Sequence, residues 1–284
     1  MTVFDYQILE NSNKNLKKNQ YLLTEENFSS VKFSHVLNLY NNQYREVKIT
    51  SDSSFENISK GQYISFVVNE VLSFSCELGS STIFLYRDKK ATDSLIYYWL
   101  YHTFFPILLT FENRYYFLHA GAVEIDFKPV LFVANSFGGK STLTDFFMKK
   151  GHAMISDDKV ASYEKDEQIF SVPSYPYHRP YRKMEDLGLF VENFVTESKV
   201  INCIFNLEKS DPNSDIIISE IFGIEKFKVL RYSTDIDLPI HRELRFKALA
   251  NIANKVQIYN ITIPWDLDRL KEVYQTIIKF IKGR

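Results

Sequence analysis

Cysteine is scarce in this sequence, and clusters of basic residues are lacking, so several classes of protein are excluded. Cys76 and Cys203 are the two cysteines, and they stand in no C-x-x-C or other metal-ligand spacing. A disulfide-stapled secreted scaffold and a cysteine-bound metal are therefore excluded. The first residues lack a basic stretch followed by an apolar one, which argues against a secretory signal. We expect a reduced, cytoplasmic protein in which both thiols are small core side chains.

An excess of charge of one sign is also lacking, because 34 Lys and Arg residues face 35 Asp and Glu residues, for a net charge of −1. A chain with this charge balance has no excess of positive charge to attract nucleic acid or an anionic membrane surface, so we expect neither partner. Apolar residues at 45% and charged residues at 24% are typical of a globular protein. A chain of 284 residues can bury a sizeable core in one large domain or two small ones.

One uncharged segment has to be weighed as a membrane span. Residues 94–111 contain no Asp, Glu, Lys or Arg over eighteen residues, which is about the minimum length for a spanning helix. Its Tyr, Trp and His residues fall in the first half rather than at two flanking belts, and Pro106 interrupts it. We expect a buried helix, with membrane insertion as the alternative.

The patterning predicts three segments: a β-rich N-terminal lobe over 1–92, a connecting helix over 93–113 and an α/β core over 114–284. In the lobe, short alternating runs are divided by clusters of Asn, Ser, Gly and Asp. In the core, strand and helix patterns alternate and 160–172 has a hairpin pattern, so we expect an α/β (α+β) fold with a mixed sheet. Core strands are predicted at 116–125, 130–133, 153–155, 160–163, 169–172, 200–207, 216–222 and 256–261, and helices at 141–150, 182–187, 243–254 and 266–282.

The most informative stretch is 131–142, Leu-Phe-Val-Ala-Asn-Ser-Phe-Gly-Gly-Lys-Ser-Thr, which has the pattern of a strand, a turn and a helix. It resembles a P-loop, G-x-x-x-x-G-K-[ST], with Ala134 in place of the first glycine and Gly139, Lys140 and Ser141 in their usual places. Backbone N–H groups of such a turn hold phosphate oxygens. Lys140 would neutralise the β- and γ-phosphates and Ser141 would offer a hydroxyl to Mg²⁺. The alternative is an ordinary strand–turn–helix with a chance lysine.

Acidic residues and a histidine flank this loop in the sequence. Asp157 lies seventeen residues after Lys140 and is followed by Asp158, and His119 stands at the start of a strand pattern upstream. Carboxylates on the strand next to a P-loop lie beside the metal and the γ-phosphate, and one carboxylate can accept the proton of an acceptor hydroxyl. The alternatives are a solvated turn for the aspartates and a structural role for the histidine.

Together these pieces, in this order and spacing, resemble the HPr kinase family and its smaller relatives, the HPr-kinase-related or serine kinases, whose pattern is L-H-A-S-A-V…G-x-S-G-x-G-K-S-T…S-D-D. Residues 173–188 are similar to the family's Pro-x-x-Pro-x-x-Arg…Leu-Gly segment, and 256–268 to its C-terminal end. The likeness covers about Tyr115 to the C-terminus. It implies a mixed-sheet P-loop kinase core of the HPr kinase/PEP carboxykinase type.

The resemblance also implies roles for individual residues. Asp157 is expected to be the base and Asp158 the carboxylate on the metal side, and the reverse order stays open. Arg179 and Arg182 lie in a Pro/Tyr-rich loop suited to clamping phosphates. The catalytic set is Asp157, Asp158, His119 and Lys140; the nucleotide-binding set is Asn135, Ser136, Phe137, Gly138, Gly139, Lys140, Ser141, Thr142 and Arg179; and the metal ligands are Ser141 and Asp158.

Three positions depart from the family pattern. Ala134 and Phe137 replace glycines of the loop, and Phe137 would be strained by about 1–2 kcal/mol if its position needs a positive φ. The adjacent Gly138 and Gly139 are expected to take over that backbone role. At 220–223 the chain has Phe222 where bifunctional relatives have the arginine of Glu-x-Arg-Gly, which argues against phosphorolysis and against HPr as substrate.

The leading hypothesis is a Mg-ATP-dependent kinase that phosphorylates a serine-type hydroxyl of a peptide or protein, natural-product precursor peptides included. Ala134 and Phe137 favour the alternative, a non-catalytic nucleotide- or peptide-binding module. The intact Lys140, with Ser141 and the two aspartates, favours catalysis. A small-molecule hydroxyl as acceptor, another nucleoside triphosphate as donor and a homo-oligomer are left open.

Overall fold

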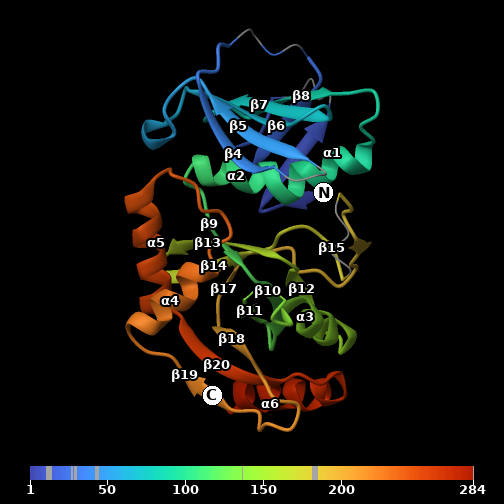
Figure 1. The fold of residues 1–284 in the computed structure, drawn as a ribbon, viewed down its shortest axis with the longest axis vertical. Helices are drawn as coiled ribbons and strands as arrows, with labels where there is room; N and C mark the ends of the chain where they lie inside the picture. Colours follow the sequence, from blue (N-terminus) through green and yellow to red (C-terminus); the bar gives the residue numbers. More distant parts are fainter. Residues whose placement is uncertain are drawn as a thin grey trace. The chain divides into compact units, whose positions relative to one another are not determined.

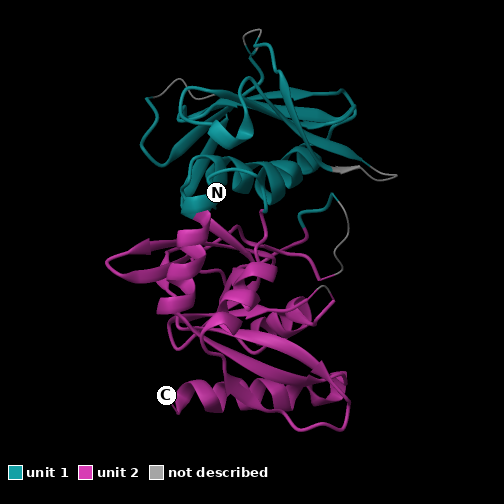
Figure 2. Ribbon diagram, turned by 60° about the vertical axis from the view of Figure 1, so that its left-hand side comes forward, with its two compact units in different colours: residues 1–115, 183–187, 237–244 teal, residues 116–182, 188–236, 245–284 magenta. Residues whose placement is uncertain are grey.

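The computed structural model describes residues 1–10, 15–26, 28, 31–41, 45–135, 137–180 and 185–283. The chain divides into two compact units, coloured separately in Figure 2. Unit 1 comprises Met1–Tyr115, Lys183–Leu187 and Asp237–Leu244, and unit 2 comprises Tyr116–Arg182, Gly188–Ile236 and Arg245–Arg284.

Unit 1 is built on an eight-stranded sheet in the order β1-β2-β3-β8-β7-β6-β5-β4. Its β3 pairs in parallel with β2 and β8, and the other neighbours pair antiparallel. The strong alternation of buried and half-buried residues in β5 is what a sheet with one covered face requires. The strands are β1 (Thr2–Val3), β2 (Tyr6–Glu10), β3 (Gln20–Thr24), β4 (His35–Asn41), β5 (Glu46–Ser51), β6 (Tyr63–Val68), β7 (Leu72–Glu77) and β8 (Thr82–Arg87), and a 3-10 turn, η1, spans Phe55–Asn57.

The uncharged segment forms a buried helix in unit 1, as the sequence predicts. It runs through α1 (Asp93–Trp99), the π-helical turn η2 (Leu100–Phe104) and α2 (Phe105–Phe111), and Pro106 is tolerated because it lies in the first turn of α2. The ring of Phe104 stacks 5.0 Å from that of Phe74 and lies 5.9 Å from that of Phe66. This segment therefore groups with the strands of unit 1 rather than forming a separate connector. None of the helices in the described ranges combines the length and apolarity needed to cross a bilayer.

Unit 2 contains a six-stranded mixed sheet in the order β12-β10-β11-β18-β20-β19 (Figure 1). The pairs β11–β18 and β18–β20 are parallel and the other pairs are antiparallel. The expected α/β (α+β) class with a mixed sheet and a β-rich N-terminal part is confirmed. The strands are β10 (Gly121–Ile125), β11 (Lys128–Val133), β12 (Met154–Ser156), β18 (Cys203–Ser210), β19 (Ile218–Glu220) and β20 (Gln257–Pro264).

A second, antiparallel sheet of unit 2 has the order β17-β14-β13-β9. Its β13–β14 hairpin confirms the pattern at 160–172. A two-stranded pair, β15–β16, stands apart from both sheets. These strands are β9 (Tyr116–His119), β13 (Lys159–Lys165), β14 (Gln168–Val172), β15 (Tyr177–His178), β16 (Leu189–Phe190) and β17 (Lys199–Val200), and the helices of this part of the chain are α3 (Lys140–Lys149), α4 (Ile224–Tyr232), α5 (Arg242–Lys255), η3 (Leu267–Arg269) and α6 (Leu270–Lys282).

Two predicted elements differ from the structure, and one helix was not predicted. The strand predicted at 116–125 breaks at Ala120 into β9 and β10, which join different sheets because Ala120 donates its N–H to the carbonyl of Asp158. The helix predicted at 182–187 is wrong at 185–187, which are not helical, and its remaining residues lie outside the described chain. Helix α4 was not predicted. The predicted apolar face of the last helix does pack on the core, where Val273, Ile277 and Ile281 meet the side chains of β18 and β20.

Candidate functional site

The loop between β11 and α3 has the layout of a phosphate-binding loop. Lys140, the first residue of α3, is 2% exposed, and its Nζ donates a hydrogen bond to the carbonyl of Ala134 at 2.9 Å. Across the loop, the N–H of Gly138 donates to the carbonyl of Asn135 at 2.9 Å. The ammonium thus lies inside the turn, where a helix N-terminus and backbone N–H groups favour anions. Ser136 lies outside the described residues.

Backbone geometry explains which loop positions need glycine. A Cβ added to Gly138 would lie 2.5 Å from the Cβ of Ala134, so this position has no room for a side chain. Gly139 has φ +89° and Phe137 has φ 60°, and both are left-handed. Ala134 is not among the described residues with positive φ and is buried. The expected strain therefore falls on Phe137, whose side chain is 78% exposed.

Asp157 and Asp158 are adjacent but contact different partners. Asp157 is 8% exposed; its Oδ2 accepts the backbone N–H of Arg179 at 2.8 Å, and its Oδ1 lies 3.0 Å from Nδ1 of His178. Asp158 has Oδ1 3.2 Å from Nδ1 of His119 and Oδ2 3.6 Å from Nη2 of Arg179. Arg179 bridges the two aspartates, through its backbone to one and its side chain to the other. Three residues predicted from the sequence, His119 and the aspartate pair, therefore meet at one place with Arg179.

His178 is a functional candidate that the sequence motifs did not indicate. It is 3% exposed and lies between two carboxylates, with Nε2 3.5 Å from Oδ1 of Asp145 on α3. In the described chain neither ring nitrogen makes a hydrogen bond of good geometry, so the contacts are ionic in character. Burial lowers the pKa of His178, but the carboxylates of Asp157 and Asp145 outweigh it, so the pKa is raised above its usual value.

The β15–β16 pair holds the backbone of His178 in place. Strand β15 pairs His178 with Leu189 of β16. Gly188, just before β16, has φ +93°, and a Cβ there would lie 2.3 Å from the carbonyl oxygen of His178. A side chain at Gly188 is therefore excluded. This explains why the 173–188 segment has a glycine at its end, a feature that the sequence indicated only through the family resemblance.

Asp235 is a third carboxylate beside the site, and it too was missed. Its Oδ2 lies 2.6 Å from Nζ of Lys159, and its Oδ1 lies 3.8 Å from Nδ1 of His119. Burial works to lower the pKa of Lys159, but Asp235 and Asp158 outweigh it and raise the pKa. Asp235 and Lys159 are 76 positions apart in the sequence, which explains why no local pattern revealed the pair.

The electrostatics of His119 connect the loop to the acidic residues. Burial lowers the pKa of His119 most, Asp158 acts against it, and the ammonium of Lys140 lowers it further. The lysine of the loop and the histidine of β9 are therefore close enough to influence each other's charge. Arg182, the second arginine of the Pro/Tyr-rich loop, lies outside the described residues.

Mg²⁺ commonly uses one or two protein carboxylates and completes its shell with phosphate oxygens and water. In the described ranges, no group of three or more His, Cys, Asp or Glu side chains is arranged to hold a metal ion. A metal held mainly by phosphate oxygens and water would need few protein ligands, and the buried ammonium of Lys140 would offer positive charge to those phosphates. Ser141, half-buried in the first turn of α3, and Asp158 remain the predicted ligands.

No family model matches the chain. Curated proteins named HPr kinase/phosphorylase, from Lactobacillus johnsonii and Lactobacillus gasseri, are each 32% identical to it over 104 residues, covering 34% of this chain and 33% of the relative. The chain thus matches about a third of the length of these relatives. The solved Hpr(Ser) kinase/phosphatase from Coxiella burnetii is 15% identical, with a TM-score of 0.36, over 59% of this chain and 93% of that one. The sequence matches confirm the resemblance of this chain to the HPr kinase-related family.

Proposed function

We propose that this protein is a Mg-ATP-dependent kinase that phosphorylates a serine-type hydroxyl of a peptide or protein. One observation carries the proposal: the Asp157–Asp158 pair lies in a single cluster with His119, His178 and Arg179. His178 of that cluster also faces Asp145 on α3, the helix that begins at Lys140. The sequence matches to HPr kinase/phosphorylases support a phosphotransferase. Natural-product precursor peptides are one class of acceptor to be tried.

The loop residues hold the phosphates in this proposal. The N–H of Gly139 and the ammonium of Lys140 bind phosphate oxygens, and Thr142 lies in the first turn of α3. Mg²⁺, when bound through Ser141 and Asp158, supplies positive charge that offsets the charge of the phosphates. Because the ammonium of Lys140 is buried, its attraction for phosphate is little screened by salt.

Asp157 is the proposed base. As the acceptor oxygen bonds to the γ-phosphorus, the bond from that phosphorus to the β–γ bridging oxygen breaks, and the hydroxyl proton passes to Asp157. Asp157 is buried and held by two neighbours, the backbone N–H of Arg179 at its Oδ2 and the ring of His178 at 3.0 Å from its Oδ1. These contacts fix the orientation of the carboxylate, which supports this role. Asp158 is more exposed, and its carboxylate faces His119 and Arg179, which suits the metal side.

Phe137 favours a second candidate function, a nucleotide-binding module without turnover. The family has glycine at this position, whereas Phe137 is bulky and has φ 60°. Phosphate transfer gives no reason for such a residue in the loop. The two functions differ in one measurable respect, because the module binds ATP and forms no phosphorylated product.

The test is ATP consumption and product mass in the presence of peptides encoded next to the gene. The expected result is ADP formed in equal amount to a peptide heavier by one phosphoryl group, with serine as the modified residue. Loss of both signals in Lys140→Ala, with both retained in Lys150→Ala at the far end of the same helix, is the matched control. ATP binding without phosphorylated product from any hydroxyl acceptor would instead support the module.

A further inference from the structure

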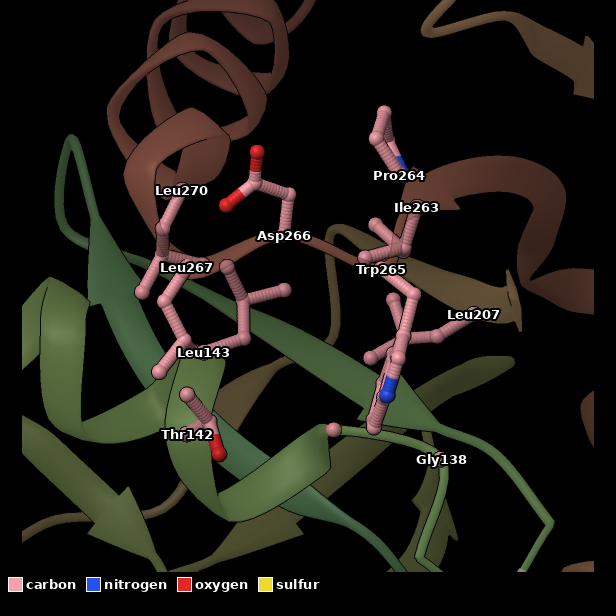
Figure 3. A pocket seen from close by; sticks show the side chains of 11 residues that line it. Gly138, Thr142, Leu143, Leu207, Ile263, Pro264, Trp265, Asp266, Leu267 and Leu270 are labelled. Carbon is pink, nitrogen blue, oxygen red and sulfur yellow. The ribbon is translucent and has the colours of Figure 1, made fainter. Parts of the chain in front are cut away.

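A cavity of about 220 Å³ opens beside the phosphate loop in unit 2 (Figure 3). Gly138, Gly139 and Thr142 of the loop and of α3 form one side of it. The segment that leads from β20 into η3 forms another side, with Trp265 and Leu267. The loop glycines therefore face both the predicted phosphate site and this cavity.

The walls of the cavity are mostly apolar. Among its described lining residues, the polar side-chain groups are the hydroxyl of Thr142, the carboxylate of Asp266 and the indole N–H of Trp265. The carboxylate of Asp266 is already engaged, because it accepts the N–H of Asp268 at 3.0 Å and caps η3. Leu143 and Leu207 extend the apolar wall. Such a lining offers apolar contact area to a ligand but few groups that can form hydrogen bonds with it.

Trp265 is held firmly at the mouth of the cavity. Its backbone N–H donates to the carbonyl of Ser210 at 3.1 Å, and the ammonium of Lys209 lies 3.7 Å from the centroid of its ring. A Cβ on Gly139 would be 3.5 Å from Cζ3 of the indole, so the ring edge lies over the loop. The indole is still 51% exposed. A large aromatic surface is thus available next to the loop, on a fixed backbone.

We propose that this cavity binds the base and sugar of the nucleotide whose phosphates lie on the loop, with Trp265 packing against the base. The inference rests on the proposed nucleotide site and goes beyond it by assigning the base and its mode of recognition. The volume of the cavity is below the range of about 300–1,000 Å³ for sites that bind drug-sized ligands. A cavity of this size suits one nucleobase, with its sugar near the opening. A flat heteroaromatic ring gains binding free energy from an apolar cavity with an aromatic side chain in its wall, because the two rings can stack.

This mode of recognition predicts weak discrimination between bases. Sites built to hydrogen-bond a group reject analogues by about 10⁴–10⁵-fold, whereas apolar pockets discriminate by about 10–200-fold at most. Since the lining offers few polar groups and one oxygen of Asp266 is used in capping η3, we expect ATP and GTP affinities within about tenfold of each other.

The chain provides its own reporter for the test. Its two tryptophans are Trp99, which is fully buried in unit 1, and Trp265. The full chain with Mg²⁺ is titrated with ATP, GTP and inorganic tripolyphosphate, followed by tryptophan fluorescence and calorimetry. We expect both nucleotides to change the fluorescence, and tripolyphosphate to bind with heat but without that change.

Substitutions separate the base site from the phosphate site. Trp265→Leu should weaken ATP and GTP by about tenfold, within the range for base–aromatic stacking, and leave tripolyphosphate binding unchanged. Trp265→Phe should keep most of the affinity. Phe127→Ala, which removes another exposed aromatic outside the cavity lining, should bind all ligands as wild type does.

The outcomes distinguish the two proposals. If tripolyphosphate binds and Trp265→Leu still binds ATP as tightly as wild type, the base lies elsewhere and the inference is wrong, while the proposed nucleotide site survives. If neither ATP nor tripolyphosphate binds to the wild-type protein, the proposed function fails and the inference fails with it.

Discussion

The Nδ1 of His178 lies 3.0 Å from the Oδ1 of Asp157, and the other nitrogen of the same ring faces Asp145 on α3. The imidazole thus connects the proposed base to the helix that begins with Lys140, the proposed phosphate-binding lysine. Its burial and its two acidic neighbours make it a positioning residue for Asp157. A rigid link of this kind keeps the carboxylate fixed relative to the loop, which proximity-based catalysis needs.

We predict that His178→Leu lowers the free energy of unfolding of unit 2 by about 3 kcal/mol, because removing one partner of a buried ion pair leaves the other uncompensated. His178→Asn keeps a donor near Asp157 and should lose less. Denaturant-induced unfolding followed by circular dichroism measures both. His35→Leu, in the N-terminal sheet of unit 1 and exposed, is the control that should change little. Equal stability of His178→Leu and wild type would show that the ion pair contributes nothing.

The raised pKa of His178 gives the stability a definite pH dependence. The folded state favours the protonated ring, so its contribution is fully present below the usual pKa of 6.5 and is lost as pH rises through the folded-state pKa. We therefore expect the wild type to lose stability relative to His178→Asn as pH rises above about 6.5. Unfolding curves of both proteins at a series of pH values measure the difference. Parallel pH profiles would contradict a raised pKa.

The aspartate pair allows the assignment of base and metal ligand to be tested. Asp157→Asn should lower turnover by about 10²–10⁴-fold with nucleotide affinity largely retained, because the amide cannot accept the acceptor's proton. Asp158→Asn should raise the Mg²⁺ concentration needed for half-maximal turnover, because it removes a proposed metal ligand, and should change the pH profile less. Steady-state turnover over a range of Mg²⁺ concentrations separates the two effects. If Asp157→Asn is active and Asp158→Asn is not, the roles are reversed.

Lys140 should dominate nucleotide binding. Lys140→Ala removes a buried ammonium, and the loss should be at least about 1.5–3 kcal/mol, the range for hydrogen bonds to charged groups. Calorimetric titration with Mg-ATP measures it. Lys150→Ala, on the same helix and packed over the ring of Phe146, should bind as wild type does. A folded Lys140→Ala protein with unchanged affinity would rule out the phosphate-loop interpretation.

The local features of the site could be predicted from the sequence and the long-range ones could not. The strand–loop–helix around Lys140 and the aspartate pair are encoded in continuous stretches with their own periodicity. His178 stands next to Arg179, but at a position that the family segment leaves open. Asp235 follows the bridge between Thr234 and Leu118 and belongs to none of the motifs in the sequence. The break at Ala120 was missed because its cause is a hydrogen bond to Asp158, which is brought there by the fold.

Phe137 should be the strained residue of the loop, and Ala134 should not. Phe137 has φ 60°, so Phe137→Gly relieves about 1–2 kcal/mol of backbone strain in the folded state. The extra freedom of glycine in the unfolded chain offsets about 0.4–1 kcal/mol of that gain. We expect a net stabilisation or no change, with ATP affinity preserved or increased.

Ala134→Gly is the matched control, because it makes the same kind of change in the same loop without strain to relieve. Ala134 is buried and is not among the described residues with positive φ, so this variant should be destabilised by the added freedom of its unfolded chain. Stability and Mg-ATP affinity are measured on the two variants side by side. Loss of ATP binding in Phe137→Gly, with Ala134→Gly unaffected, would mean that the exposed ring of Phe137 contacts a ligand. The left-handed backbone at Phe137 would then serve ligand binding. Backbone strain is often kept at functional sites for such a reason.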